Sequence, residues 1–283
     1  MGKILVTGAS GNVGSEVARL LAEAGYPVRA AARDAERLRS TLPGVDRAVL
    51  DFERPETYTA ALRDVDRLFL VRPPAISETR RYVDPFVDAA RDAGTERIAF
   101  LSLLGVEKNP ILPHRRIERH LEVSGFSYTF LRASFFMQNL STVNRAEIRK
   151  RGVLVVPAGR GRTSFVDARD LAAVAAKALT EPGHENRAYP LTGGEALDYF
   201  EVTNVLSEVL GTRIVYARPG VPEFVRAARA RGLPWGLVAV MVGIYTTARL
   251  GLADTVTDDL ARILNRPPTT LRKFASDLRE TWA

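Results

Sequence analysis

Residues 3–25, KILVTGASGNVGSEVARLLAEAG, join a short apolar run to a helical pattern through three closely spaced glycines. Residues 3–7 have the composition of a buried strand, and residues 13–24 carry apolar side chains at helical spacing. Gly8, Gly11 and Gly14 fall at the joint. Glycines there permit a tight turn, a close approach of backbone to a ligand and tight packing of helix on sheet.

The N–H groups at the start of that helix could bind an anion. They have no partner within the helix and bear a partial positive charge, which suits a pyrophosphate. The glycines follow a strand and open a helix, as a dinucleotide-binding loop requires. We therefore predict nucleotide binding; the alternative is a strand–helix turn with incidental glycines.

Composition excludes several classes of site. Of its 283 residues, 46% are hydrophobic and 26% are charged, and this composition is ordinary for a globular protein. The length fits one large domain or a domain with a smaller lobe. It has no cysteine, so disulfides and thiolate chemistry are excluded. The histidines (His114, His120 and His184) lack metal-ligand spacing, so we expect no metal.

The net charge of +7 raises the question of a nucleic-acid partner. The basic residues are spread along the chain, and the cluster HRRIER at 114–119 contains its own glutamate. No nucleic-acid-binding motif accompanies them, so we expect no such partner. A general positive field would instead attract an anionic cofactor.

The chain also lacks the sequence features of export or membrane insertion. Its N-terminus runs directly into the first expected strand, which leaves no room for a signal peptide. Residues 232–247, GLPWGLVAVMVGIYTT, are uncharged, but sixteen residues fall short of a bilayer span. We expect a buried helix or a pocket wall there, no membrane association and a cytoplasmic protein.

Strand-like and helix-like segments alternate through the first half of the chain, which predicts a parallel sheet with helices on both faces. The expected fold is α/β, a Rossmann-type doubly wound parallel sheet with a smaller mixed C-terminal lobe. The expected dinucleotide-binding domain comprises 1–150 and about 164–192, and the substrate-binding lobe comprises about 151–163 and 193–283. Strands are expected at 3–7, 27–33, 47–50, 66–71, 97–102, 127–132 and 187–193. Helices are expected near 12–24, 34–41, 56–63, 78–93 and 113–124, and residues 164–179 are expected to form a short strand followed by a capped helix.

The end of the second expected strand indicates which nucleotide is bound. NAD-binding folds usually place an acidic residue there for the ribose 2′-hydroxyl, whereas VRAAAR ends in Arg33. A guanidinium can hold a 2′-phosphate through charge-assisted hydrogen bonds. Asp34 follows, either as a ribose ligand or as the N-cap of the next helix. We predict NADP(H) in preference to NAD(H).

The tyrosine–lysine pair of ordinary short-chain dehydrogenases is missing. In those enzymes a lysine four residues after the tyrosine lowers the phenol pKa for proton transfer. None of the eight tyrosines here has lysine at that position. Chemistry through that pair is therefore disfavoured.

Six segments stand in this order along the chain: VTGASGNVG (6–14), VRAAAR (28–33), VLDF (49–52), LSLLGV (101–106), HRRIERHLEVSGFSYTFLRASFFMQNL (114–140) and SFVDARDLAAVAAKAL (164–179). Together they resemble the NmrA-like branch of atypical short-chain dehydrogenases. That branch includes NAD(P)H:quinone and azo-dye reductases, isoflavone-reductase-like enzymes and non-catalytic NADP-sensing regulators. The likeness continues through residues 188–202 and 266–282, so it covers nearly the whole chain.

The resemblance implies a set of cofactor-binding positions. The glycine loop would surround the pyrophosphate, Arg33 would hold the 2′-phosphate, Asp51 and Phe52 would meet the adenine, and residues 71–73 would approach the ribose and nicotinamide. Arg72 departs from the small polar residue expected there. The implied cofactor-binding residues are Thr7, Gly8, Ser10, Gly11, Asn12, Val13, Gly14, Arg33, Asp51, Phe52, Val71, Arg72 and Pro73.

The resemblance also implies where the reaction takes place. Ser102 and Leu103 would end the fifth strand near the nicotinamide, and His114 matches a lysine of the isoflavone-reductase-like members. Ser102 and His114 are the catalytic candidates; His114 could instead be a helix-start residue bonded to water. The expected substrate pocket comprises Leu103, Phe135, Phe136, Met137 and Asn139, with core packing as the alternative role of the aromatic side chains.

These expectations combine into a functional prediction. The chain would be an NADPH-dependent oxidoreductase that transfers hydride to a small, flat, conjugated acceptor such as a quinone, azo dye, enone or imine. It would act as a monomer or homodimer. The alternative is a non-catalytic, NADP(H)-sensing regulator of the NmrA type, which the missing tyrosine–lysine pair would also suit.

Overall fold

The computed structural model describes residues 2–282, which divide into two compact units. The first unit contains the described residues up to Ala133, together with Ala168–Leu191 and Arg262–Asn265. The second contains Ser134–Asp167, Thr192–Ala261 and the described residues from Arg266 onward.

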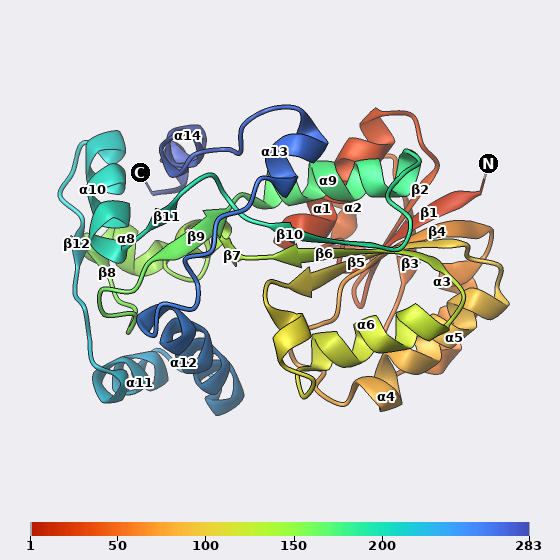
Figure 1. Ribbon diagram of the computed structural model, residues 1–283, viewed down its shortest axis with the longest axis horizontal. Coiled ribbons are helices and arrows are strands. Elements are labelled where there is room, and N and C mark those ends of the chain that lie inside the picture. Colours follow the sequence, from red (N-terminus) through yellow and green to blue (C-terminus); the bar gives the residue numbers. More distant parts are fainter. Residues whose placement is uncertain (1, 283) are drawn as a thin grey trace. The chain divides into compact units, whose positions relative to one another are not determined.

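The first unit is built on a parallel sheet of seven strands in the order β10-β6-β5-β4-β1-β2-β3. This order places β1 between β2 and β4, so the direction of winding reverses between β1 and β4 (Figure 1). The predicted α/β Rossmann-type fold is confirmed, with all seven expected strands present. The strands are β1 (Lys3–Val6), β2 (Val28–Ala32), β3 (Asp46–Val49), β4 (Val65–Leu70), β5 (Arg97–Leu103), β6 (Ser127–Ala133) and β10 (Arg187–Leu191).

Helices cover both faces of this sheet. Figure 1 shows α1 and α9 on one face and α5 and α6 on the other. Phe86 of α5 and Phe100 of β5 are fully buried in the core on the second face. The helices of this unit are α1 (Asn12–Glu23), α2 (Leu38–Thr41), α3 (Tyr58–Leu62), α4 (Thr79–Tyr82), α5 (Asp84–Asp92), α6 (Pro113–Val123) and α9 (Ala168–Thr180), with 3-10 turns η1 (Pro55–Thr57) and η2 (Val106–Lys108).

The second unit has a small mixed sheet and a core of its own. Strand β9 pairs parallel with β7 and antiparallel with β11, and β8 pairs with β12. The strands are β7 (Phe135–Phe136), β8 (Val153–Leu154), β9 (Thr163–Val166), β11 (Ala196–Leu197) and β12 (Val215–Tyr216). The helices are α7 (Gln138–Ser141), α8 (Arg145–Arg151), α10 (Tyr199–Leu210), α11 (Val221–Ala230), α12 (Trp235–Arg249) and α14 (Leu271–Asp277), with η3 (Arg279–Thr281); α13 (Asp259–Leu264) begins in this unit and ends in the first.

The expected domain boundary at residue 150 differs from the boundary in the structure. Residues 134–150 belong to the second unit. Their strand, β7, pairs with β9, and Met137, Leu140 and Ile148 lie in the core of that unit. An apolar run after a strand does not reveal which of two cores it joins, so the sequence pattern could not place this boundary.

Helix α12 occupies most of the uncharged segment at 232–247. It is not a buried helix, because Trp235 is 64% exposed and Val240 is 52% exposed. Val238, Met241, Tyr245 and Ala248 form its buried side. Within residues 2–282, no helix combines the length and apolar character needed to cross a membrane.

Candidate functional site

The glycine loop between β1 and α1 has the conformation that its glycines allow. Gly8 has a φ of +62°, which side chains disfavour. A Cβ on Gly14 would lie 2.3 Å from the carbonyl oxygen of Gly8, whereas one on Gly11 would lie 3.3 Å from it. Gly14 therefore has to be glycine for α1 to begin this close to the loop.

The first turn of α1 presents N–H groups without a side-chain cap. Its N-cap is Gly11, which has no side chain to accept from them. The N–H groups of Asn12, Val13 and Gly14 lack intrahelical partners because they belong to the first turn. Val13 is only 3% exposed, so it offers a ligand its backbone and not its side chain.

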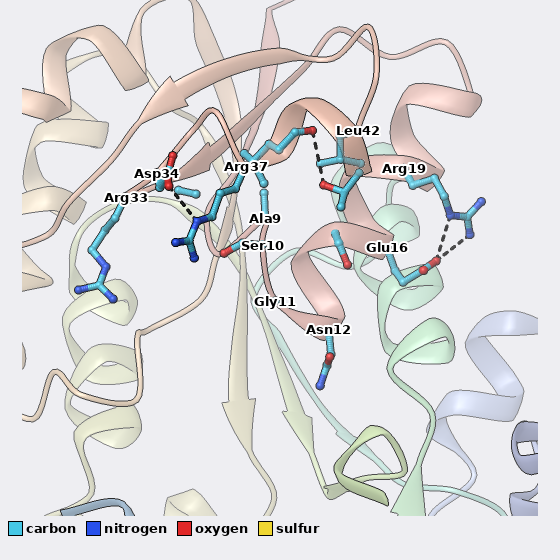
Figure 2. Close-up of a pocket in the computed structure, with 14 residues that line it drawn as sticks. Ala9, Ser10, Gly11, Asn12, Glu16, Arg19, Arg33, Asp34, Arg37 and Leu42 are labelled. Atoms are coloured by element: carbon cyan, nitrogen blue, oxygen red, sulfur yellow. Dashed lines mark hydrogen bonds and ion pairs between the residues drawn. The ribbon is translucent and has the colours of Figure 1, made fainter. Parts of the chain in front are cut away.

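A cleft of about 710 Å³ lies beside this turn (Figure 2). It is bounded by the glycine loop, the first turns of α1, and the segment from the end of β2 through α2. It brings together four of the expected cofactor residues: Ser10, Gly11, Asn12 and Arg33. The lining residues are Ala9, Ser10, Gly11, Asn12, Ser15, Glu16, Arg19, Ala32, Arg33, Asp34, Arg37, Leu38, Thr41 and Leu42.

The arginines of the cleft differ in how they are paired. Arg33 is exposed and forms no ion pair or hydrogen bond among the described residues. Arg37 pairs with Asp34 at 2.9 Å, and Arg19 pairs with both Glu16 and Glu23 at 2.7 Å. Within residues 2–282, Arg33 is thus a cation without a partner, at the edge of a cleft that begins at the glycine loop.

Asp34 does not cap the next helix, which was one of its two expected roles. Helix α2 begins only at Leu38, and its N-cap, Arg37, makes no side-chain cap bond. Sequence reasoning missed Arg37 because residues 34–41 were expected to be helical. The turn at 34–37 instead places Arg37 in the cleft.

Thr7 has its hydroxyl occupied by the sheet. This fully buried hydroxyl donates to the carbonyl of Phe69 at 3.1 Å and accepts from the N–H of Val71 at 2.8 Å. It therefore ties the carboxyl end of β1 to that of β4, where the winding of the sheet reverses. Thr7 positions the loop, and its side chain has no donor left for a phosphate.

The residues expected at the adenine follow β3. Phe52 is 5% exposed and packs edge-to-face on Phe86, with ring centroids 5.0 Å apart. The Asp51 carboxylate accepts a hydrogen bond from the N–H of Glu53 at 3.0 Å. The aromatic ring of Phe52 belongs to the core, and its carbonyl accepts from the Tyr58 hydroxyl at 2.7 Å, which leaves the backbone N–H for a ligand.

Arg72 follows the end of β4 and folds back on its own loop. Its Nη1 donates to the carbonyls of Pro73 and Pro74 at 3.0 and 3.2 Å, and also to that of Ile76. Its Nε is buried and has no partner among the described residues. The guanidinium therefore fixes the loop at 73–76 and keeps a cation at this edge of the sheet.

His114 is the second residue of α6 and is neutral over the physiological range. Its ring stacks on Phe100 with a centroid separation of 6.0 Å. Burial, reinforced by the positive charge of Arg72, lowers the pKa of His114 to about 3. A neutral imidazole can donate a hydrogen bond but supplies no imidazolium proton at pH 7.

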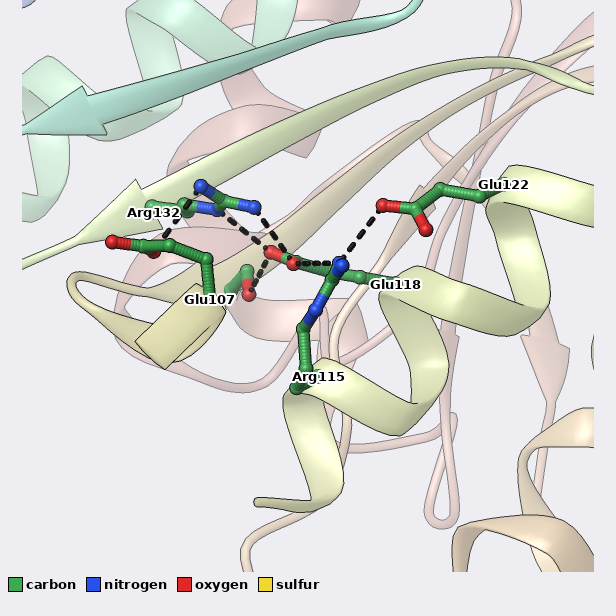
Figure 3. Close-up of polar contacts among 6 residues, drawn as sticks. Glu107, Arg115, Glu118, Glu122 and Arg132 are labelled. Atoms are coloured by element: carbon green, nitrogen blue, oxygen red, sulfur yellow. Dashed lines mark hydrogen bonds and ion pairs between the residues drawn. The ribbon is translucent and has the colours of Figure 1, made fainter. Parts of the chain in front are cut away.

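Ser102 contacts an ionic cluster centred on the buried Glu118. Figure 3 shows the charged members of this cluster, Glu107, Arg115, Glu118, Glu122 and Arg132. The Ser102 hydroxyl is 1% exposed and donates to the carboxylate of Glu118 at 2.7 Å. Glu118 is fully buried and also accepts two hydrogen bonds from Arg132, at 3.0 and 2.9 Å, and one from Arg115 at 3.0 Å. Glu107 and Glu122 pair with the outer sides of Arg132 and Arg115.

Sequence reasoning missed this cluster apart from Ser102. Charged residues on the sheet-facing side of α6 and an arginine inside β6 are the signals that could have found it, since buried charges require partners. Because Glu118 already takes the hydroxyl hydrogen, only the lone pairs of Ser102 remain for another group.

The expected pocket residues divide between the two units. Leu103 ends β5 in the first unit and is 39% exposed. The other four belong to the second unit: Phe135 and Phe136 form β7, Met137 is the N-cap of α7, and Asn139 lies in α7. Met137 is 3% exposed within the core, whereas both phenylalanines are partly buried.

The second unit also has an apolar surface on α12. Trp235, Leu237, Val240 and Ile244 are each 43–64% exposed. Arg229 lies over the Trp235 ring, 4.7 Å from its centroid. Exposed apolar side chains grouped on one helix mark a binding surface more often than scattered ones do.

Comparisons with known proteins agree with this arrangement. The chain is 37% identical to an NAD(P)H azoreductase of Xenophilus azovorans over 277 residues, or 96% of each chain. Its fold matches Citrobacter sp. triphenylmethane reductase complexed with NADP(H), with a TM-score of 0.86, 28% identity and coverage of 97% and 99% of the two chains. It also matches the NADPH-dependent quinone oxidoreductase of Escherichia coli complexed with NADPH, with a TM-score of 0.85, 27% identity and the same coverage.

The chain also matches a family model. The model of the NmrA-like family covers residues 1–245, which includes the glycine loop, the seven-stranded sheet and most of the smaller unit. The resemblance inferred from the sequence motifs is confirmed, and the chain belongs to the NmrA-like family.

Proposed function

We propose that this chain is an NADPH-dependent oxidoreductase that reduces small, flat, conjugated acceptors such as quinones and azo dyes. The observation that carries the proposal is the cleft in which the glycine loop and the unpaired Arg33 lie together. Relatives that align over nearly the whole chain support it, because they are an azoreductase, a triphenylmethane reductase and a quinone oxidoreductase.

The residues present fit a phosphorylated dinucleotide. Glycine at positions 8 and 14 lets the loop pass close to Val71 and lets α1 begin directly beside the loop, so the N–H groups of its first turn lie next to the cleft. Arg33 supplies a cation for the 2′-phosphate and accounts for a preference for NADP(H) over NAD(H). The cofactor supplies hydride from its nicotinamide ring, and the protein positions it.

The proton donors of this site suit an acceptor that needs little acid catalysis. His114 is neutral because its pKa is about 3, and the hydroxyl hydrogen of Ser102 is bonded to Glu118. Neither group readily donates a proton to a substrate at pH 7. A quinone becomes a stabilised phenolate on accepting hydride, and solvent can protonate it. A simple ketone would leave a basic alkoxide, which requires a donor.

We assign different tasks to the two catalytic candidates. His114 would donate a neutral N–H hydrogen bond to the ribose or acceptor. Ser102 would act as a positioning residue that holds the end of β5. The smaller unit would bind the acceptor, with the exposed face of α12 and the phenylalanines of β7 as candidate contacts.

We also propose a cellular location, an oligomeric state and a partner class for the enzyme. We place it in the cytoplasm, where NADPH is regenerated, as a monomer or homodimer with no nucleic-acid partner. Basic residues distributed along the chain support this last point, since nucleic-acid-binding proteins gather them on one face.

Steady-state oxidation of NADPH with a panel of quinones, azo dyes, triphenylmethane dyes and imines tests the proposal. Turnover with at least one acceptor class, and faster turnover with NADPH than with NADH, is the expected result. Binding of NADPH without turnover of any acceptor would refute the proposal in favour of a redox-sensing regulator.

A further inference from the structure

Asp34 and Arg37 form an ion pair inside the same cleft as Arg33. The pair closes at 2.9 Å, although the side chains remain 55% and 82% exposed, respectively. Pairs this exposed contribute at most about 1 kcal/mol to stability. The pair therefore costs little to open, and either partner can exchange the other for a ligand.

The neighbouring pair provides a comparison within the same segment. Glu36 and Arg39 pair at 3.0 Å with the same spacing of three residues, and their side chains are 74% and 69% exposed. Neither residue lines the cleft, whereas Asp34 and Arg37 both do. Figure 2 shows Arg33, Asp34 and Arg37 together on the turn after β2.

The position of Asp34 sets opposing requirements for the two dinucleotides. A free carboxylate next to Arg33 would repel a 2′-phosphate, yet it would accept a hydrogen bond from a ribose 2′-hydroxyl. Arg37 compensates that negative charge while the pair is closed. The Arg37 guanidinium has five N–H donors, so it can also serve as a second guanidinium for a phosphate without leaving Asp34.

On the basis of the proposed function, we propose that the Asp34–Arg37 pair sets the cofactor choice of this enzyme. With NADPH, Arg37 joins Arg33 on the 2′-phosphate while it keeps its contact with Asp34, so the carboxylate stays compensated. With NADH, Asp34 accepts from the 2′-hydroxyl while Arg37 keeps its charge balanced. The chain thus binds both dinucleotides, with Arg37 specific for the phosphorylated one and Asp34 specific for the other.

Dissociation constants of NADPH and NADH, measured by calorimetry, test this inference. We expect Arg37→Ala to weaken NADPH binding by about tenfold, because one charge-assisted contact is lost and Asp34 is left unpaired. Binding of NADH by that variant should stay within about twofold or become tighter. Asp34→Ala should do the opposite, weakening NADH about fivefold and not weakening NADPH.

The matched controls are Arg39→Ala and Glu36→Ala, which make the same charge changes outside the cleft. Both should leave both constants within about twofold, since exposed charges at a distance are screened by salt. The inference is overturned if Arg37→Ala weakens NADPH no more than Arg39→Ala does. Equal weakening of both dinucleotides by Arg37→Ala, or unchanged NADH binding by Asp34→Ala, would also overturn it. Failure of the wild-type chain to bind either dinucleotide would refute the proposed function itself.

Discussion

The hydroxyl of Ser102 and the carboxylate of Glu118 form a 2.7 Å hydrogen bond between the end of β5 and the middle of α6. Both groups are almost entirely buried. Two guanidiniums, those of Arg115 and Arg132, share the same carboxylate. The bond therefore anchors the end of β5 in the first unit to a buried group whose charge is neutralised by its neighbours.

Glu118→Gln should destabilise the fold strongly. An amide carries no charge to pair with Arg132 and Arg115, and breaking a buried pair from one side costs about 3 kcal/mol or more. Glu122→Gln is the matched control, because Glu122 pairs with Arg115 from a side chain that is 33% exposed; it should cost less than about 1 kcal/mol. Urea unfolding measures both, and equal losses would show that Glu118 is not central to the cluster.

Ser102→Ala should separate a positioning role from proton donation. Loss of the hydrogen bond to Glu118 should reduce the free energy of unfolding by about 1–2 kcal/mol. The kcat for a quinone should fall by less than about tenfold, and Ser102→Thr, which keeps the hydroxyl, should recover most of that loss. A thousandfold fall in kcat with stability unchanged would instead make Ser102 the proton donor.

His114→Gln should change how the free energy of unfolding depends on pH, and should have a smaller effect on kcat. The unfolded chain binds this proton with a pKa of 6.5 and the folded chain with a pKa of about 3. Between these values the unfolded state holds more protons, so stability falls as pH falls from 6.5 toward 3, by about 1.4 kcal/mol per pH unit at most. Urea midpoints of wild type and variant, compared from pH 7 to pH 4, should therefore converge or cross as acid is added.

The kcat of the His114→Gln variant tests whether His114 donates a proton in the reaction. Because His114 is already neutral, the profile of kcat between pH 5 and pH 8 should show no inflection that His114→Gln removes. We expect the rate to stay within about tenfold of wild type. A loss beyond a thousandfold would identify His114 as an essential donor.

Gly14→Ala should disrupt the loop that Gly11→Ala tolerates better. Its Cβ would stand 2.3 Å from the Gly8 carbonyl oxygen, against 3.3 Å for the Gly11 variant. We expect a loss of about 1–3 kcal/mol in stability, together with the loss of NADPH binding. Gly236→Ala, at a helical glycine with nothing within 4 Å of the added Cβ, should leave both unchanged or raise stability slightly. Equal behaviour of the three variants would exclude the steric explanation.

The parts of this molecule that the sequence predicts are those governed by local pattern. The alternation of strand-like and helix-like segments predicted the parallel sheet. The glycine spacing and Arg33 predicted a nucleotide site, and these residues line the cleft. The Ser102–Glu118–Arg132 contacts join residues 14 to 16 positions apart. They meet only after β5, α6 and β6 have packed, so periodicity could not reveal them.

Side-chain roles were harder to predict than backbone roles. Thr7 and Phe52 stand at expected cofactor positions, yet the sheet uses the Thr7 hydroxyl and the core uses the Phe52 ring. Arg37 escaped notice because a short turn replaced the first half of an expected helix. Burial and turn geometry depend on tertiary packing, and the local pattern of a single sequence does not determine that packing.

Trp235 offers the most direct test of acceptor binding by the smaller unit. Its ring is 64% exposed, with Arg229 over one face, so a flat acceptor can stack on the ring. Trp235→Ala should raise the KM for an aromatic quinone by about three- to tenfold, and leave the dissociation constant of NADPH unchanged. Leu252→Ala removes a side chain that is 69% exposed and lies outside α12, so it controls for the general loss of apolar surface. If both variants raise KM equally, or if neither does, the acceptor does not bind on this face of α12. A rise confined to Trp235→Ala would instead assign the selection of flat acceptors to that helix.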